Sequence, residues 1–242
     1  REDGYFPEAF VNLLAMLGWN PGTEQELFTL EELTAAFSLE RVIKSGARFN
    51  ADKAKWYNKE YLRTKSAEEL ATLYIPVLES HGLQIVDCPA CALTAGSAMN
   101  VAGADFENRI FSRQYVERVV ALIQERATFV ADFWDIASYL FVAPTEFVEK
   151  DAAKFWKEEN YTLALQAADF ILGFDGEFTK ASLEGPLEEY IRGNEWPMGK
   201  VMNCLRLALV GASSGLGIAD IVTLIGKDEF AKRIEYIKSK LC

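Results

Sequence analysis

The chain has 242 residues, of which 50% are hydrophobic and 25% charged, the composition of an ordinary globular protein, which excludes extensive disorder. Its net charge of −11 excludes a uniformly basic nucleic-acid coat, although a local basic segment can still attract an anion. The four cysteines are few enough to indicate a reducing compartment, and no run of about 18 apolar residues predicts a membrane-spanning helix.

Short helices are predicted along the first third of the chain. Residues 7–17 carry apolar side chains at helical spacing. Thr29, with Glu32 three residues later, has the pattern of a capping box and opens a helix that reaches about Phe37. Residues 52–62 form a third helix, and Ser66 begins a second capping box that opens a helix to about His81.

Helical periodicity also dominates the rest of the sequence. Expected helical segments cover residues 105–127, 145–173, 186–191, 201–210, 218–226 and 229–241. The segment 83–86 has strand character but is too short to carry a sheet, and 173–177 is expected to be a loop. We therefore predict an all-α fold.

A basic segment stands out in this acidic chain. Between Arg41 and Lys65 there are eight cations and only two acids, Asp52 and Glu60, which gives this segment a local charge of +6. The cations are Arg41, Lys44, Arg48, Lys53, Lys55, Lys59, Arg63 and Lys65. The concentration of positive charge suggests an anionic partner, whereas the alternative is a solvated helix face. Within the segment, Trp56 is interpreted as a core residue.

Two further motifs have competing interpretations. Cys88 and Cys91 have the spacing of a zinc pair, but they supply only two ligands, and paired buried thiols are the alternative. The glycine-rich stretch 211–217 resembles the turn of short-chain dehydrogenases, but too few residues follow it to build the required sheet. We expect these glycines to separate two helices, with Ile218 opening the second. No catalytic constellation and no metal site is predicted.

The order of residues in the basic segment resembles the stem-contact region of bacterial glutamyl-tRNA synthetase. The matching residues are Phe37, Arg41, Val42, Lys44, Ser45, Gly46, Ala47, Phe49, Asn50, Lys53, Trp56, Asn58, Tyr61 and Leu62. Residues 4–32 are similar to the sequence that follows the signature lysine loop of this family, and residues 205–234 are similar to its last helical domain. The resemblance is weak from about residue 83 to residue 190.

The resemblance implies a class I aminoacyl-tRNA synthetase that uses ATP and Mg²⁺ to attach glutamate to tRNA. The nucleotide-binding domain is expected in a preceding part of a longer parent protein, since the chain opens without an initiator Met and has no His-x-Gly-His signature. For this chain alone we expect no catalytic residues and no cofactor. The expected role is recognition of tRNA(Glu), with tRNA(Gln) as a further candidate, by a cytoplasmic monomer without membrane contact.

Site residues follow from the resemblance by position. It implies anticodon contacts at Gln124, Arg126, Arg192, Arg206 and Ile218. It implies stem or backbone contacts at Arg41, Lys44, Arg48, Lys53 and Lys55. Gln124 stands where some members carry the arginine that reads the third anticodon base, so the separation of glutamate from glutamine anticodons is in question. The planar, forked donors of arginine suit both base edges and phosphate oxygens.

The expected organisation has three parts. A stem-contact region covers residues 1–64, and two helical anticodon-binding subdomains cover 65–155 and 156–242. The alternative function is a helical protein-interaction module with no role in RNA binding. The salt dependence of binding discriminates RNA recognition from protein interaction, because RNA binding weakens steeply with salt through counterion release.

Overall fold

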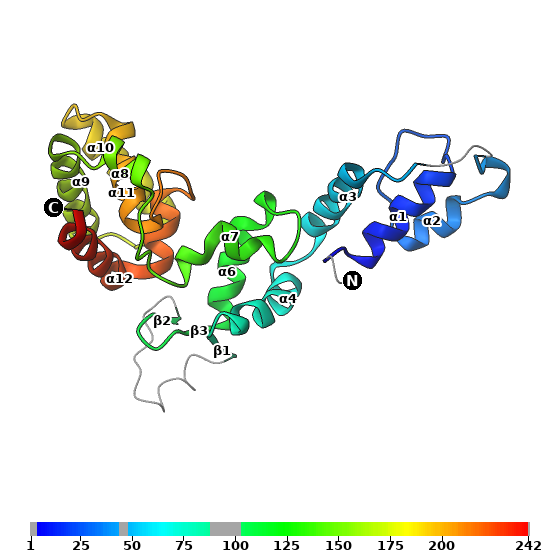
Figure 1. The fold of residues 1–242 in the computed structure, drawn as a ribbon, viewed down its shortest axis with the longest axis horizontal. Helices are drawn as coiled ribbons and strands as arrows, with labels where there is room; N and C mark the ends of the chain where they lie inside the picture. Colours follow the sequence, from blue (N-terminus) through cyan, green and yellow to red (C-terminus); the bar gives the residue numbers. More distant parts are fainter. Residues whose placement is uncertain (1–3, 44–47, 88–102, 242) are drawn as a thin grey trace. The chain divides into compact units, whose positions relative to one another are not determined.

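Helices make up most of the computed structural model, which describes residues 4–43, 48–87 and 103–241 (Figure 1). The chain divides into two units. The N-terminal unit comprises Arg1–Ser80 and Val120–Ile136, and the C-terminal unit comprises His81–Val119 and Ala137–Cys242. Helix α6, Arg113–Ile123, contains the boundary at residue 120.

The N-terminal unit consists of short helices joined by loops. Its elements are α1 (Pro7–Gly18), α2 (Leu30–Ala36), η1 (Leu39–Arg41), α3 (Ala51–Thr64), α4 (Ala67–Ser80), η3 (Gln124–Arg126) and most of α7 (Asp132–Ala137). Helix α1 packs against α2 and α3. A small core of Trp19, Phe28 and Leu33 supports the end of α1 and the start of α2.

Capping side chains set the starts of these helices. The capping box of Thr29 and Glu32 is confirmed, because each side chain accepts a hydrogen bond from the backbone N–H of the other residue. Ser66 and Glu69 make the same reciprocal pair at the start of α4. Asn50 caps α3 by accepting from the backbone N–H groups of Asp52 and Lys53. These bonds satisfy donors that a helix start leaves without partners.

Two fully buried asparagines join α1 and α3 to the loops around them. Asn58 accepts from the backbone N–H of Phe6 at 2.8 Å and donates to the carbonyl of Thr128 at 2.6 Å. Asn12 accepts from the N–H of Phe28 at 2.8 Å and donates to the carbonyl of Glu26 at 3.0 Å. Because a buried amide without partners is costly, these bonds fix the register between the segments.

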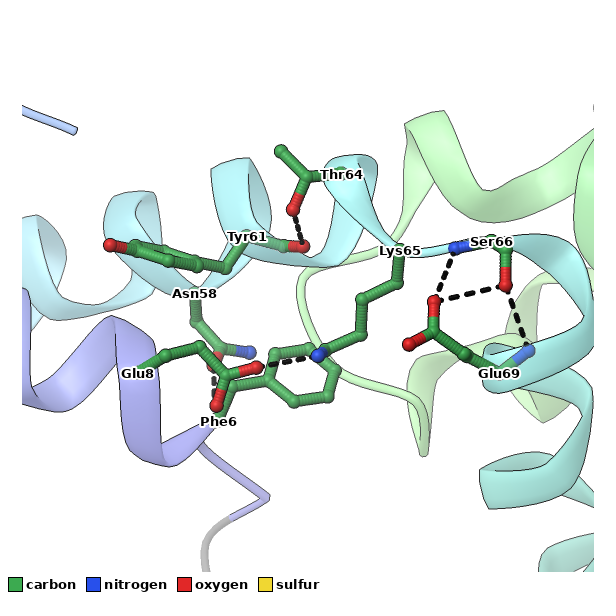
Figure 2. Close-up of polar contacts among 8 residues, drawn as sticks. All are labelled: Phe6, Glu8, Asn58, Tyr61, Thr64, Lys65, Ser66 and Glu69. Carbon is green, nitrogen blue, oxygen red and sulfur yellow. Dashed lines mark hydrogen bonds and ion pairs between the residues drawn. The ribbon is translucent and has the colours of Figure 1, made fainter. Parts of the chain in front are cut away.

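The junction of α3 and α4 is also tied to α1. Figure 2 shows Lys65 extending from the end of α3 to an ion pair with Glu8, close to the ring of Phe6. The Lys65 ammonium lies 4.6 Å from the centroid of that ring. The hydrogen bond from Lys65 holds the pKa of the Glu8 carboxyl below its usual value although partial burial opposes this.

The C-terminal unit combines a small sheet with a bundle of helices. Its elements are β1 (Gln84–Val86), β2 (Ala104–Asp105), β3 (Ile110–Ser112), the first part of α6, η4 (Ser138–Leu140), α8 (Glu149–Phe155), α9 (Glu158–Leu172), α10 (Lys180–Gly193), α11 (Met198–Val210) and α12 (Ile218–Leu241). Helix α11 packs against α8, α9 and α12. The mainly helical fold class is therefore confirmed.

The sheet corrects two expectations. Residues 83–86 do carry a strand, since β1 pairs in parallel with β3, with Ile85 opposite Phe111. The expected helix over 105–127 starts only at Arg113, because residues 104–112 form an antiparallel hairpin. Asp105 stabilises the hairpin turn by accepting from the backbone N–H of Asn108, a local bond that competes with helix formation. The three-residue strands persist because each pairs with a neighbour and Phe111 is fully buried.

Glycines end and bend the last helices. Gly211 ends α11 in the left-handed region at φ 84°, and a Cβ there would lie 2.7 Å from the carbonyl oxygen of Glu146. Gly226, at φ 82°, interrupts α12 where the sequence predicted the end of one helix and the start of another. Among the described residues, no helix is long and apolar enough to cross a membrane.

Replacement of Asn58 tests the importance of the buried amide. We expect Asn58→Ala to lower the free energy of unfolding of the N-terminal unit by about 1–3 kcal/mol, because the Phe6 N–H and the Thr128 carbonyl lose their partner. Urea unfolding followed by circular dichroism measures the change. Asn20→Ala is the control and should cost clearly less, because the exposed Asn20 side chain accepts a local hydrogen bond from the nearby Gly22 N–H. Equal losses in the two variants would contradict the role of Asn58.

Candidate nucleic-acid interface

Helix α3 exposes positive charge because its apolar residues occupy only one face. Ala54, Tyr57, Asn58 and Leu62 are buried, whereas Lys55, at the edge of this face, is exposed. The spacing of three to four residues between the buried positions is that of one helix face. Burial of that face in the unit therefore turns the cations of the basic segment outwards.

Several of these cations already have anionic partners. Lys53 pairs with Glu26, Lys65 with Glu8, and Arg63 with both Glu60 and Glu125 at 2.9 Å. Glu8, Glu26 and Glu125 lie outside the segment, so the fold reduces the local charge of +6 that the sequence suggests. Such half-exposed ion pairs contribute little stability and exchange readily for other partners.

The remaining stem-contact candidates differ in whether their charged groups already bind another described residue. Arg48 and Lys55 are exposed and make no ion pair with any described residue. Arg41 is exposed, but its guanidinium donates to the carbonyl of Pro21. Lys44 lies outside the described residues. Arg48 and Lys55 are thus the cations most available for an incoming phosphate.

The interpretation of Trp56 as a core residue is wrong. Its side chain is 37% exposed, whereas the adjacent Tyr57 is 1% exposed. Neighbouring helical residues point about 100° apart, so only one of the two can face the core. Burial raises the pKa of Tyr57 to about 12. The Lys53 ammonium lies 4.6 Å from the Trp56 ring centroid, so an exposed aromatic surface adjoins the cations.

Gln124 and Arg126 lie in the N-terminal unit, on the short helix η3. The ion pair between Arg63 and Glu125 joins η3 to the end of α3. Arg126 is exposed, whereas Gln124 is half-buried and its Oε1 atom has no hydrogen-bond partner in the described part of the chain. These two anticodon candidates therefore lie beside the last turn of the basic helix.

Arg206 and Ile218 meet at the turn between α11 and α12 in the C-terminal unit. Arg206 is half-buried and donates to the carbonyls of Leu216 at 3.3 Å and Ser213 at 3.4 Å. It also donates to the side chain of Asn203 at 3.0 Å, and burial lowers its pKa. Ile218 begins α12 and is only 4% exposed. Some of the N–H donors of the Arg206 guanidinium therefore bind the backbone of this turn.

Two residues that the sequence did not single out fix the same turn. The Tyr139 hydroxyl accepts from the backbone N–H of Leu216 at 3.1 Å, and Asp151 accepts from that of Ser213 at 2.7 Å. The bond from Ser213 lowers the pKa of the Asp151 carboxyl. Both partners are more than 60 residues away in sequence, so no local pattern indicates them. Ser214 and Gly215 remain exposed at the tip of the turn.

Arg192 stands apart from that turn, in the last turn of α10. Its side chain is 72% exposed and lies 3.7 Å from the Glu188 carboxylate one turn earlier. Among the described residues no hydrogen bond or ion pair joins it to Arg206 or Ile218. Arg206 and Ile218 therefore lie at the same turn, whereas Arg192 lies on α10 without a described bond to either of them.

The structure describes the glycine-rich stretch 211–217 but not the cysteine pair. The stretch Gly211–Gly217 follows helix α11 instead of a strand, so it lacks the strand-turn-helix context of a dinucleotide site, and the expected break between two helices is confirmed. Cys88 and Cys91 lie outside the described residues.

Two known families match the chain. The family described as Anticodon binding domain matches residues 69–238, and the family described as tRNA synthetases class I (E and Q), catalytic domain matches residues 1–56. The first match covers more than half of the chain and includes Gln124, Arg126, Arg192, Arg206 and Ile218. The second includes Arg41, Lys44, Arg48, Lys53 and Lys55.

Individual relatives agree with the family matches. The glutamate–tRNA ligase of Parabacteroides distasonis is 40% identical over 97% of the chain and 41% of its own length. That of Flavobacterium johnsoniae is 41% identical over 100% of the chain and 42% of its own length. The crystal structure of a glutamate tRNA ligase from Elizabethkingia meningosepticum has a TM-score of 0.83 and 33% identity, covering 100% of the chain and 43% of that structure.

The chain spans about two fifths of the length of these relatives, and the match lies in their C-terminal part. The sequence resemblance is thereby confirmed. From its helical fold and the extent of the first family match, the chain belongs to the anticodon binding domain family and corresponds to the C-terminal part of bacterial glutamate–tRNA ligases.

Proposed function

We propose that this chain recognises the inner stem and the anticodon of tRNA(Glu) as the C-terminal part of a glutamate–tRNA ligase. The observation that carries the proposal is the match of residues 69–238 to the anticodon binding domain. The exposed cations of α3 supply a surface of suitable charge. In the whole ligase, contacts of this kind hold the acceptor end of the tRNA in register for the reaction.

The candidates divide by chemistry into positioning and reading residues. Arg48 and Lys55 contact phosphates directly, with Arg41, Lys44 and Lys53 as further contacts, and this fixes the tRNA without reading its sequence. Gln124, Arg126, Arg192, Arg206 and Ile218 face the anticodon, whose unstacked bases are the usual target of sequence-specific RNA recognition. Arg206 combines this role with support of the turn that presents Ser214 and Gly215.

Glutamate, ATP and Mg²⁺ belong to the longer ligase in this proposal. The described residues do not fit the ATP site of a class I synthetase, because the glycine-rich stretch joins two helices and His81 is the single histidine of the chain, which therefore has no His-x-Gly-His signature. We assign no step of glutamate activation to this chain. The proposed organisation keeps the parts 1–64, 65–155 and 156–242, in a cytoplasmic monomer.

A second function, protein interaction, is favoured by exposed apolar side chains in the N-terminal unit. They include Phe10, Val11, Leu14, Leu30, Phe37, Leu39, Val42, Ile43 and Phe49. Exposed apolar groups in such number are typical of contact surfaces. The same residues lie within the match to the catalytic domain, so the remainder of a ligase is an alternative partner for them.

The double variant Arg48→Ala with Lys55→Ala tests the phosphate-binding surface. We expect weaker binding of a tRNA(Glu) transcript to this chain, because two phosphate contacts are lost. The slope of log K against log salt should become shallower by about 1.4–1.8, since each contact contributes roughly 0.7–0.9. Filter binding or fluorescence anisotropy at several salt concentrations measures both quantities.

Lys150→Ala, at an exposed lysine of α8 outside the basic segment, is the control for loss of charge. It should leave the slope nearly unchanged. Binding of tRNA that does not respond to salt, or an equal slope for the double variant and wild type, would contradict the proposal. In the first case the apolar protein-interaction surface becomes the better account.

Gln124→Arg tests the reading of the third anticodon base, at which glutamate and glutamine tRNAs differ. We expect wild type to bind tRNA(Glu) and tRNA(Gln) with similar affinity, and the variant to favour tRNA(Glu). A forked base contact discriminates by about 1–3 kcal/mol, which corresponds to roughly 5-fold to 150-fold. Competition binding of the two transcripts gives the ratio.

Glu125→Gln raises the net charge by the same single unit, at the neighbouring residue, and is the matched control. It also breaks the ion pair with Arg63, so its effect on both tRNAs should be similar in size. An unchanged ratio for Gln124→Arg would remove Gln124 from the reading residues.

A further inference from the structure

The C-terminal unit contains a cavity of about 440 Å³ that none of the assigned site residues lines. Its walls come from the β2–β3 turn, the segment after η4, and helices α11 and α12. The lining is largely apolar and includes the aromatic rings of Phe106, Phe141 and Tyr236 together with Val142, Ala143, Pro144 and Ala208. A volume in this range suits a small planar ligand.

One wall carries a buried arginine with unused donors. Arg233 is 2% exposed and pairs with Glu229 at 2.7 Å. Its Nη1 atom donates to the carbonyls of Tyr139 at 2.6 Å and Leu209 at 3.1 Å. Its Nη2 atom is buried and has no hydrogen-bond partner in the described part of the chain. A buried donor of this kind is available to a further acceptor.

Two further cations line the cavity from exposed positions. Arg109 lies in the hairpin turn at φ 56°, a conformation that an arginine rarely adopts. Lys232 lies on α12, is 58% exposed and pairs with Glu107 of the hairpin turn. A pair at this exposure is weak enough for a phosphate to replace Glu107 as the partner of Lys232.

We propose that this cavity binds one unstacked nucleobase of RNA, with the attached phosphate on Arg109 and Lys232. The half-buried ring of Tyr236 provides a stacking surface for a base, and the unused donors of Arg233 suit a base carbonyl. Phe141 is 1% exposed and Phe106 lies against the Arg233 guanidinium, 5.6 Å from its Cζ atom, so these two rings close the apolar end of the cavity. The two exposed cations favour a nucleotide over an uncharged aromatic group. This inference rests on the proposed RNA-binding function and adds a subsite to it.

The test separates the base from the phosphate by comparing uridine with uridine 5′-monophosphate. Saturation-transfer NMR on the whole chain should show both compounds binding, the nucleotide more tightly. Tyr236→Ala removes a stacking wall and should weaken both by about tenfold. Arg109→Gly keeps the backbone geometry and, combined with Lys232→Ala, should reduce the affinity for the nucleotide to near that for uridine, while leaving uridine binding unchanged.

Two controls match the variants. Glu195→Gly replaces the other described non-glycine residue with positive φ, and Lys150→Ala removes an exposed cation away from the cavity. Both should bind like wild type. No binding of either compound, or equal binding by Tyr236→Ala and wild type, overturns the proposal. Preferential binding of p-cresol over uridine also overturns it, in favour of a protein side chain.

Failure of this subsite is distinguishable from failure of the proposed function. If the chain binds tRNA(Glu) with a steep salt dependence and the cavity takes no nucleotide, the subsite is wrong and the function stands. If nucleotides bind in the cavity but no tRNA binds at any salt concentration, the subsite is a general nucleotide site and the inference as a tRNA contact is wrong.

Discussion

The buried amides of Asn12 and Asn58 are the constraint on which the N-terminal unit depends. Each amide must satisfy both a donor and an acceptor away from water. The partners of Asn58 lie on two separate segments, at Phe6 and Thr128, and those of Asn12 lie in the loop at Glu26 and Phe28. Helix α3 can meet this requirement in only one rotation about its axis. That rotation buries Tyr57 and leaves Lys55 and part of Trp56 exposed, so the polar contacts of the interior determine which charges an RNA can reach.

The fold also adjusts the charge of this surface. Glu8, Glu26 and Glu125 reach the basic segment from other parts of the unit and neutralise Lys65, Lys53 and Arg63. The positively charged surface that remains is smaller than the sequence suggests and is centred on Arg48 and Lys55. A local surface of this kind is compatible with a chain of strongly negative net charge, because screening limits the reach of distant charges to about 10 Å at ordinary salt.

Arginine serves two purposes in the C-terminal unit. Arg206 holds the turn between α11 and α12, and Arg233 joins α12 to α11 and η4 through backbone carbonyls. The planar guanidinium has five donors, so a residue that supports the backbone can retain donors for a ligand. Structural and binding roles can therefore reside in one side chain, and Arg206→Ala alone cannot separate them.

Local chemistry in the sequence determined the helix starts and stops, because Thr29 with Glu32, Ser66 with Glu69, and Gly211 act through neighbouring backbone groups. It also determined the family, through an ordered set of residues. Only the tertiary structure decided the small sheet, since β1 needs a partner more than 20 residues away. The pairing of Lys53 with Glu26, the hold of Tyr139 and Asp151 on the turn, and the cavity beside Arg233 depend likewise on contacts between distant segments, which no local pattern encodes.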